Sequence, residues 1–185
     1  MMTDFELETG LVGEFRELKC DAVPCPPPGK AGHPVLVLKK EADMTTILQA
    51  AKYLVHLSYG KDRDPLTPLK LQKILYLAQG WSFVWDGRPL FPEEFEAWQY
   101  GPVNRTVYSY FKKYGRDEIS EDEGCGSLPE PDAESTLDAV WHYYSAYSAI
   151  RLADMTRMQA PWKKAARCRD IIRTEDIRSY FQSAY

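Results

Sequence analysis

The histidines and cysteines are the first candidates for metal or acid–base chemistry in this 185-residue chain. His56 and His142 lie beside the apolar positions of two predicted helices, which is typical of packed or surface histidines and not of catalytic bases. Cys20, Cys25 and His33 could be proposed as zinc ligands, but no fourth ligand follows at the spacing of a zinc finger. The sequence therefore indicates no metal ion and no cofactor.

Three glutamates stand close together before a tryptophan. Paired carboxylates can act as general acid and base, and Glu93, Glu94 and Glu96 offer such a pair. The same glutamates also suit a charged strand edge that resists pairing with another strand. The chain contains no nucleophile elbow, phosphate-binding loop or pair of metal-binding histidines. We therefore expect that the protein is not an enzyme.

Aromatic side chains gather in the middle of the chain. They are Trp81, Phe83, Trp85, Phe91, Phe95, Trp98 and Tyr100. Most of them must fill the core of a domain this size. The alternating pattern near residues 95–100 predicts a short strand, with Trp98 and Tyr100 on the face opposite Phe95. That face either packs in the core or presents aromatic residues beside Arg and Lys, as protein interfaces do.

Helical patterns flank this strand on both sides. A helix from about Thr46 to Ser58 opens with a capping-box sequence. In the next helix, Thr67 is the predicted cap and Pro68 the first residue. This second helix is apolar on most sides, which places it at the centre of its domain. Gly101-Pro102 is predicted to begin the third helix.

Prolines and helix-capping residues indicate where the remaining predicted elements begin and end. Pro89 and Pro92 confine the strand region to a sheet edge or a loop. Ser135 is predicted to start a fourth helix, which breaks near Ser148 and is followed by a short helix. Pro161 and Thr174 are predicted to start two more helices. The fold class is therefore mainly α, a compact bundle of five to seven helices with one small β element.

The first 43 residues differ from the rest of the chain. Prolines are dense between Cys20 and Pro34, and a segment of this kind stays extended and cannot be helical. We expect residues 1–43 to be an appendage and residues 44–185 to form a helical domain.

The charge distribution is uneven. The net charge is −4, whereas a chain bound mainly to nucleic acid is more often basic. Residues 117–150 contain nine acidic residues and no Lys or Arg, while residues 151–185 contain eight basic and four acidic residues. The two regions are either solvated faces or a basic C-terminal surface that meets an acidic partner.

Nothing in the sequence has the pattern of a membrane or export signal. No apolar run approaches the ~18 residues that a membrane span needs, and the N-terminus lacks the basic and apolar regions of a signal peptide. We expect a cytoplasmic protein with reduced thiols and no contact with a membrane.

Several long motifs resemble one family. The segment Leu66–Trp81 resembles the signature of the Panacea domain, also described as SocA-like or GepA-like phage-associated proteins. Further segments that match in order and spacing are Glu96–Val103, Val107-Tyr108, Tyr110–Gly115, Pro161–Lys163, Glu175–Ile177 and Tyr180-Phe181. The resemblance covers about residues 44 to 185.

This resemblance implies an antitoxin that neutralises a cognate protein toxin, encoded by an adjacent gene, by direct protein–protein contact. Members are similar in fold, their toxin partners vary, and they have no recognised catalytic residues and no cofactor. The family usually has a histidine after the turn before Pro-Trp, whereas this chain has Arg157 there. That departure puts any role of the histidine in doubt for this chain.

A toxin-binding surface is predicted around the strand and the helix start. Its candidate residues are Lys70, Lys73, Trp98, Tyr100, Gly101, Pro102 and Arg105. A second candidate surface comprises Arg157, Trp162, Lys163, Lys164 and Arg167. Both surfaces contain aromatic and arginine side chains, which are frequent anchors of protein interfaces.

A DNA-binding transcriptional regulator, which could act on its own operon, is the alternative function. The strand beside the helix that follows Pro102 could act as a winged helix. This helix carries only Arg105, Lys112 and Lys113 as cations, which is few for phosphate contacts. Nucleic acid is therefore the less favoured partner.

Overall fold

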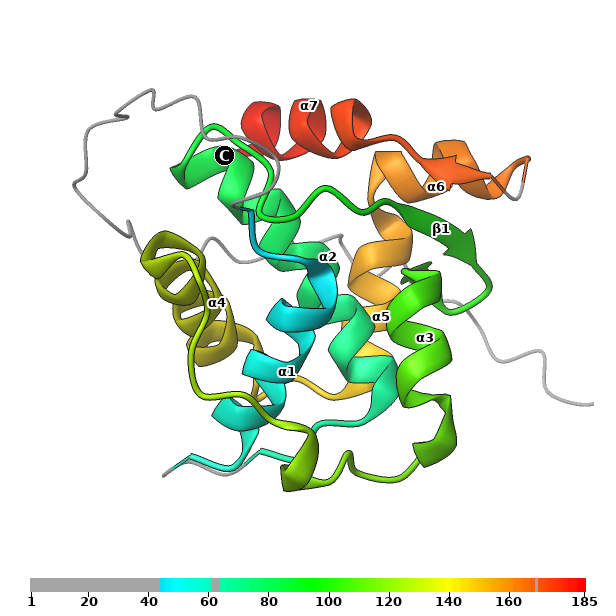
Figure 1. Ribbon diagram of the computed structural model, residues 1–185. Helices are drawn as coiled ribbons and strands as arrows, with labels where there is room; N and C mark the ends of the chain where they lie inside the picture. The colour runs from blue at the N-terminus through cyan, green and yellow to red at the C-terminus, as the bar shows by residue number, and fades with distance from the viewer. Residues whose placement is uncertain (1–43, 61–63, 169) are drawn as a thin grey trace, which may run out of the picture.

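A computed structural model describes residues 44–60, 64–168 and 170–185. The described residues form seven α-helices and a small three-stranded sheet, which confirms the predicted mainly α fold (Figure 1). The predicted appendage of residues 1–43 lies outside the described residues, and so do the zinc candidates Cys20, Cys25 and His33.

The element order alternates helices with short strands. The helices are α1 (Ile47–Ser58), α2 (Pro68–Trp85), α3 (Arg105–Phe111), α4 (Pro131–Tyr144), α5 (Ala149–Met158), α6 (Ala160–Ala166) and α7 (Thr174–Ala184). Two short 3₁₀ helices are η2 (Lys112–Tyr114) and η3 (Glu121–Glu123). The strands are β1 (Phe95–Trp98), β2 (Gly101–Val103) and β3 (Ile171–Ile172). The sheet order is β2-β1-β3, and both pairings are antiparallel.

Local capping chemistry fixes where the first two helices begin. The Thr46 hydroxyl accepts from the backbone N–H of Gln49, and the Gln49 side chain accepts from the backbone N–H of Thr46. This reciprocal capping box satisfies two N–H groups that the first turn leaves without partners. At α2 the Thr67 hydroxyl accepts from the backbone N–H of Lys70, and Pro68 occupies the first turn. Both predicted starts are confirmed.

Helix α2 runs through the middle of the bundle (Figure 1). It packs against α1, α3, α4, α5, α7 and β2, and every residue from Lys70 to Phe83 is buried. Gly80 lets α7 approach closely, because a Cβ atom there would lie 2.3 Å from the ring of Phe181. Near it, the indole N–H of Trp81 donates to the Tyr144 hydroxyl over 3.0 Å. The predicted central position of this helix is confirmed.

The third helix begins later than predicted. Gly101-Pro102 was expected to open it, but these residues belong to β2, and α3 begins at Arg105 behind the cap Asn104. Gly101 has φ +97°, a conformation in which glycine is favoured, and it pairs with Trp98 to close a tight hairpin. Pro102 fits here because β2 is an edge strand, where a missing N–H is tolerated.

The structure corrects two more expectations, namely the place of β1 in the sheet and the start of the fourth helix. β1 is the central strand and not an edge, because Pro89 and Pro92 both precede it and leave its N–H groups free to pair. Helix α4 starts at Pro131, earlier than the predicted Ser135, since proline suits a first turn. The predicted break near Ser148 is confirmed, as the Ser148 hydroxyl caps α5.

Candidate partner-binding site

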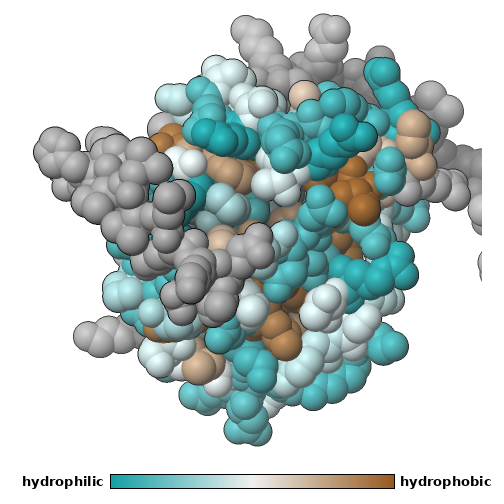
Figure 2. Space-filling model, turned by 45° about the horizontal axis from the view of Figure 1, so that its top comes forward, coloured by the Kyte–Doolittle hydropathy of each residue, from teal (hydrophilic) through white to brown (hydrophobic). Residues whose placement is uncertain are grey.

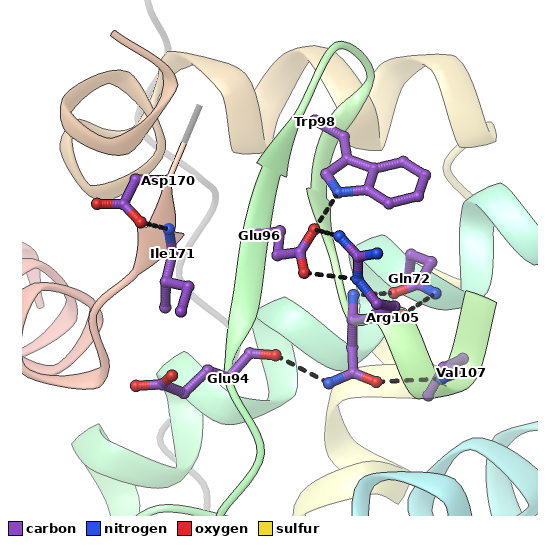
Figure 3. A network of polar contacts seen from close by, with 9 residues as sticks. Gln72, Glu94, Glu96, Trp98, Arg105, Val107, Asp170 and Ile171 are labelled. Carbon is purple, nitrogen blue, oxygen red and sulfur yellow. Dashed lines mark hydrogen bonds and ion pairs between the residues drawn. The ribbon is translucent and has the colours of Figure 1, made fainter. Parts of the chain in front are cut away.

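One asparagine fixes the hairpin to the two helices beside it. The side-chain N–H of Asn104 donates to the Glu94 carbonyl over 2.8 Å, and its side-chain oxygen accepts from the Val107 N–H. Its backbone N–H and C=O both bond to the amide of Gln72 on α2, over 2.8 and 3.1 Å (Figure 3). These bonds join the segment before β1, the end of β2 and the start of α3 to α2.

A charged pair joins β1 to α3 on the outer side of the hairpin. The guanidinium of Arg105 donates two hydrogen bonds of 2.9 Å to the carboxylate of Glu96, and the indole N–H of Trp98 donates a third over 2.8 Å (Figure 3). The bonds from Arg105 and then Trp98 lower the pKa of the Glu96 carboxyl group. The carboxylate therefore holds the orientation of both candidate anchors, Trp98 and Arg105.

The underside of the hairpin rests on a buried lysine. Lys73 is fully buried, and its ammonium donates to the Pro102 carbonyl over 2.7 Å. Desolvation lowers the pKa of this amine to about 7. A Cβ atom on Gly101 would lie 2.9 Å from the Thr156 hydroxyl and 3.2 Å from the Lys73 ammonium. The hairpin therefore lies directly on α2 and α5.

Lys70 is also in the interior. Its ammonium donates to the carbonyl of Ser145 and lies 5.7 Å from the centre of the Trp141 ring. Its pKa is lowered, chiefly by burial. The expectation that Lys70 and Lys73 are exposed at a surface is thus corrected, because both side chains are buried and donate to backbone carbonyls.

The predicted residues divide into exposed and buried groups. Tyr100 is 60% exposed, the side chain of Arg105 is 71% exposed, and Trp98 is half-buried. Gly101 and Pro102 are buried beneath them. The structure therefore brings Trp98, Tyr100 and Arg105 together at the outer face of the hairpin. The other candidates of this surface are buried: Lys70, Lys73, Gly101 and Pro102.

A groove of about 370 Å³ opens beside these residues. Trp98 and Tyr100 form one wall, α3 contributes Tyr108, and Leu69 lies at the α2 end. The rings of Trp98 and Tyr108 meet edge to face, with their centres 4.8 Å apart. Buried Val107 lines it as well, so the groove is mostly apolar.

Leu69 and Tyr108 also line the groove, although neither was predicted as a binding residue. Tyr108 stands outside the predicted apolar stripe of its helix, and an aromatic residue outside such a stripe is a signal for an exposed anchor. Leu69 gave no comparable signal, because the whole second helix is apolar.

The second candidate surface adjoins the first. The indole N–H of Trp162 on α6 donates to the carbonyl of Trp98 over 3.2 Å. A hollow of about 760 Å³ lies between β1 and α6, lined in part by these two tryptophans. Arg157 lies over the Trp162 ring, 5.5 Å from its centre, and pairs with Asp154.

Apart from Arg157 on α5, the cations of the second surface come from α6 and the turn after it. Lys163, Lys164 and Arg167 are exposed, and Lys164 pairs with Asp176 over 2.8 Å. The two predicted surfaces are therefore parts of one contiguous region that extends from α3 to α6.

The charged and metal-binding chemistry of this region is limited. In the described part of the chain, no group of three or more His, Cys, Asp or Glu side chains could hold a metal ion. On α3 and η2, Arg105 pairs with Glu96 and Lys113 pairs with Glu123, which leaves less positive charge for phosphate groups than the sequence suggested. In Figure 2, the visible face of the molecule is largely hydrophilic with small separate hydrophobic patches.

Comparisons with known proteins bear on the same region. The family model described as "Antitoxin SocA-like, Panacea domain" matches residues 71–163, which span α2 to α6. Antitoxin SocA of Caulobacter vibrioides (strain NA1000 / CB15N) is 49% identical over 51 residues, which are 28% of this chain and 27% of that protein. The alignment thus covers about a quarter of the relative's length.

Two negative findings complete the comparisons. No solved structure matches the chain. Among the helices of the described residues, none is both long and apolar enough to span a membrane.

Proposed function

Since the chain belongs to the SocA-like Panacea domain family, we propose that it is the antitoxin of a toxin–antitoxin pair and neutralises a cognate protein toxin by direct binding. One observation supports this proposal most: Trp98 of the hairpin and the exposed Arg105 at the start of α3 are both held by hydrogen bonds to Glu96. Anchors whose conformation is fixed before binding lose little entropy in the complex. The adjacent gene is the proposed source of the toxin.

The proposed binding surface is centred on Trp98, Tyr100 and Arg105. Lys70, Lys73, Gly101 and Pro102 contribute by supporting this surface from below, since they are buried. The surface extends towards Trp162 and the cations of α6. The proposed mechanism is steric: the bound antitoxin covers the active site of the toxin or holds the toxin in an inactive shape. It assigns no catalytic step to this chain.

Co-expression with the adjacent gene tests the proposal. We expect the neighbouring protein to inhibit growth when expressed alone, to be tolerated together with this protein, and to co-purify with it. Failure of both rescue and binding would refute the antitoxin role.

Two substitutions test the surface. Trp98→Ala and Arg105→Ala should each weaken toxin binding by about thirtyfold, which corresponds to ~2 kcal/mol, while the melting temperature stays within a few degrees. Arg178→Ala on α7 is the matched control, because Arg178 is exposed and α7 packs on the far end of α2. Equal loss of binding in all three variants would contradict this surface.

A further inference from the structure

The groove beside the hairpin has one continuous apolar wall. Val107 and Phe111 on α3 are almost fully buried at its base, and Leu69 lies at the end formed by α2. Trp98 and Tyr108 stand at its rim with their rings in contact. A volume of about 370 Å³ accommodates a few large apolar side chains.

The polar groups at the base of the groove are already satisfied. The amide of Gln72, which lines the groove, bonds through both its oxygen and its nitrogen to the backbone of Asn104. Pockets for small polar ligands use free polar groups to orient the ligand. This groove offers contact area for apolar side chains instead, which is how protein segments anchor themselves.

The rim of the groove carries positive charge. Arg105, Tyr108 and Lys112 follow at helical spacing along α3 and its cap, so they share one face. Lys112 is exposed and has no ion-pair partner among the described residues, and the same holds for Arg116 next to the groove residue Gly115.

No acidic side chain is among the described residues that line the groove. The N-terminus of α2 also reaches the groove through Pro68 and Leu69 and adds a partial positive charge to it. A ligand with negative charge on its flanks therefore complements this rim.

We infer that the groove between α2, the β1–β2 hairpin and α3 receives an amphipathic helix of the toxin, whose apolar stripe fills the groove and whose acidic flank faces Lys112 and Arg116. This inference rests on the proposed function and identifies the part of the toxin that is bound. Apolar anchors at helical spacing suit the depth of such a groove, and the acidic flank fixes the direction of the helix.

Two substitutions separate the apolar and the charged parts of the inference. Tyr108→Ala should weaken the complex with the purified toxin of the adjacent gene by about thirtyfold. Lys112→Glu should reduce the association rate by about tenfold and make it less sensitive to salt. Arg178→Glu is the control for the charge reversal, because Gly80, where α7 packs, lies about 16 Å along α2 from Leu69. Lys112 is exposed, so its replacement tests the groove even if Tyr108→Ala fails to fold.

Photo-crosslinking identifies the bound segment directly. A benzoylphenylalanine in place of Tyr100, in the full-length protein, should crosslink to a toxin segment with apolar residues at helical spacing and Asp or Glu beside them. A crosslink to any other kind of segment, or to a second copy of this chain, would overturn the inference, and so would full binding by both groove variants. In those cases the wild-type protein still binds and rescues growth; absence of wild-type binding would instead refute the proposed function.

Discussion

Lys73 should destabilise the folded protein at neutral and acidic pH, because its charge is buried without a carboxylate beside it. Its only hydrogen-bond acceptor among the described residues is the Pro102 carbonyl. Burial lowers the pKa of this amine from 10.5 to about 7. The unfolded chain therefore binds one more proton than the folded chain between these two pH values, so stability should rise with pH there.

The magnitude follows from the difference between the two pKa values. Below pH 7 the folded state carries the full penalty, roughly 5 kcal/mol for 3.5 pKa units at about 1.4 kcal/mol per unit. From pH 6 to pH 9 the stability of the wild-type chain should rise by about 2–3 kcal/mol through Lys73 alone. Lys73→Met removes the titrating group at similar volume, but it leaves the Pro102 carbonyl without its donor, which costs about 1–3 kcal/mol. The net effect at pH 6 is therefore stabilisation by about 2–4 kcal/mol.

Thermal and urea unfolding at pH 6, 7, 8 and 9 measure this effect. The melting temperature of the wild type should rise relative to that of Lys73→Met by about 5–10 °C over this range. Lys112→Met is the control, because Lys112 is exposed, and its pH profile should stay parallel to that of the wild type. Parallel profiles for wild type and Lys73→Met would show that Lys73 is charged and solvated in the folded state, and the reasoning from burial would fail.

Three further outcomes are expected. Leu75→Ala, at a fully buried position of α2, should lower the free energy of unfolding by about 2–5 kcal/mol, measured by urea denaturation. A near-zero change would show that this face of α2 does not point into the core. Gly101→Ala should cost more than about 1 kcal/mol, because φ is +97° and a Cβ atom would press on Thr156 and Lys73, and wild-type stability would refute the hairpin geometry. Removal of residues 1–43 should change the melting temperature by only a few degrees, since the predicted domain starts at residue 44, and a large loss would show that the segment contributes to the core.

Helix positions could be predicted from the sequence where capping chemistry and periodicity agree. Thr46 with Gln49 and Thr67 with Pro68 both occupy the positions that their side chains favour. Gly101-Pro102 misled the prediction, because proline suits both the first turn of a helix and an edge strand. Only the pairing with β1, which is a tertiary contact, decides between them.

The buried lysines show a second limit of sequence reasoning. Lys70 and Lys73 were expected to be exposed because lysine is rarely buried without a paired charge. A helix that is apolar on most sides leaves no outward face, however, and this feature could have indicated that its lysines are internal too. Trp98 and Tyr100 were predicted as a candidate surface, but the groove beside them depends on Tyr108 and Leu69, which come together only in the folded chain.

The close contact between Gly80 and Phe181 affects how the protein is made in the cell. Helix α7 follows every other described element in the chain, yet its Phe181 ring covers Gly80 in the C-terminal half of α2. During translation, the apolar surface of α2 under this ring stays uncovered until residues through Phe181 have left the ribosome. We therefore expect this part of α2 to stay exposed until α7 docks, which makes the docking of α7 a late step of folding.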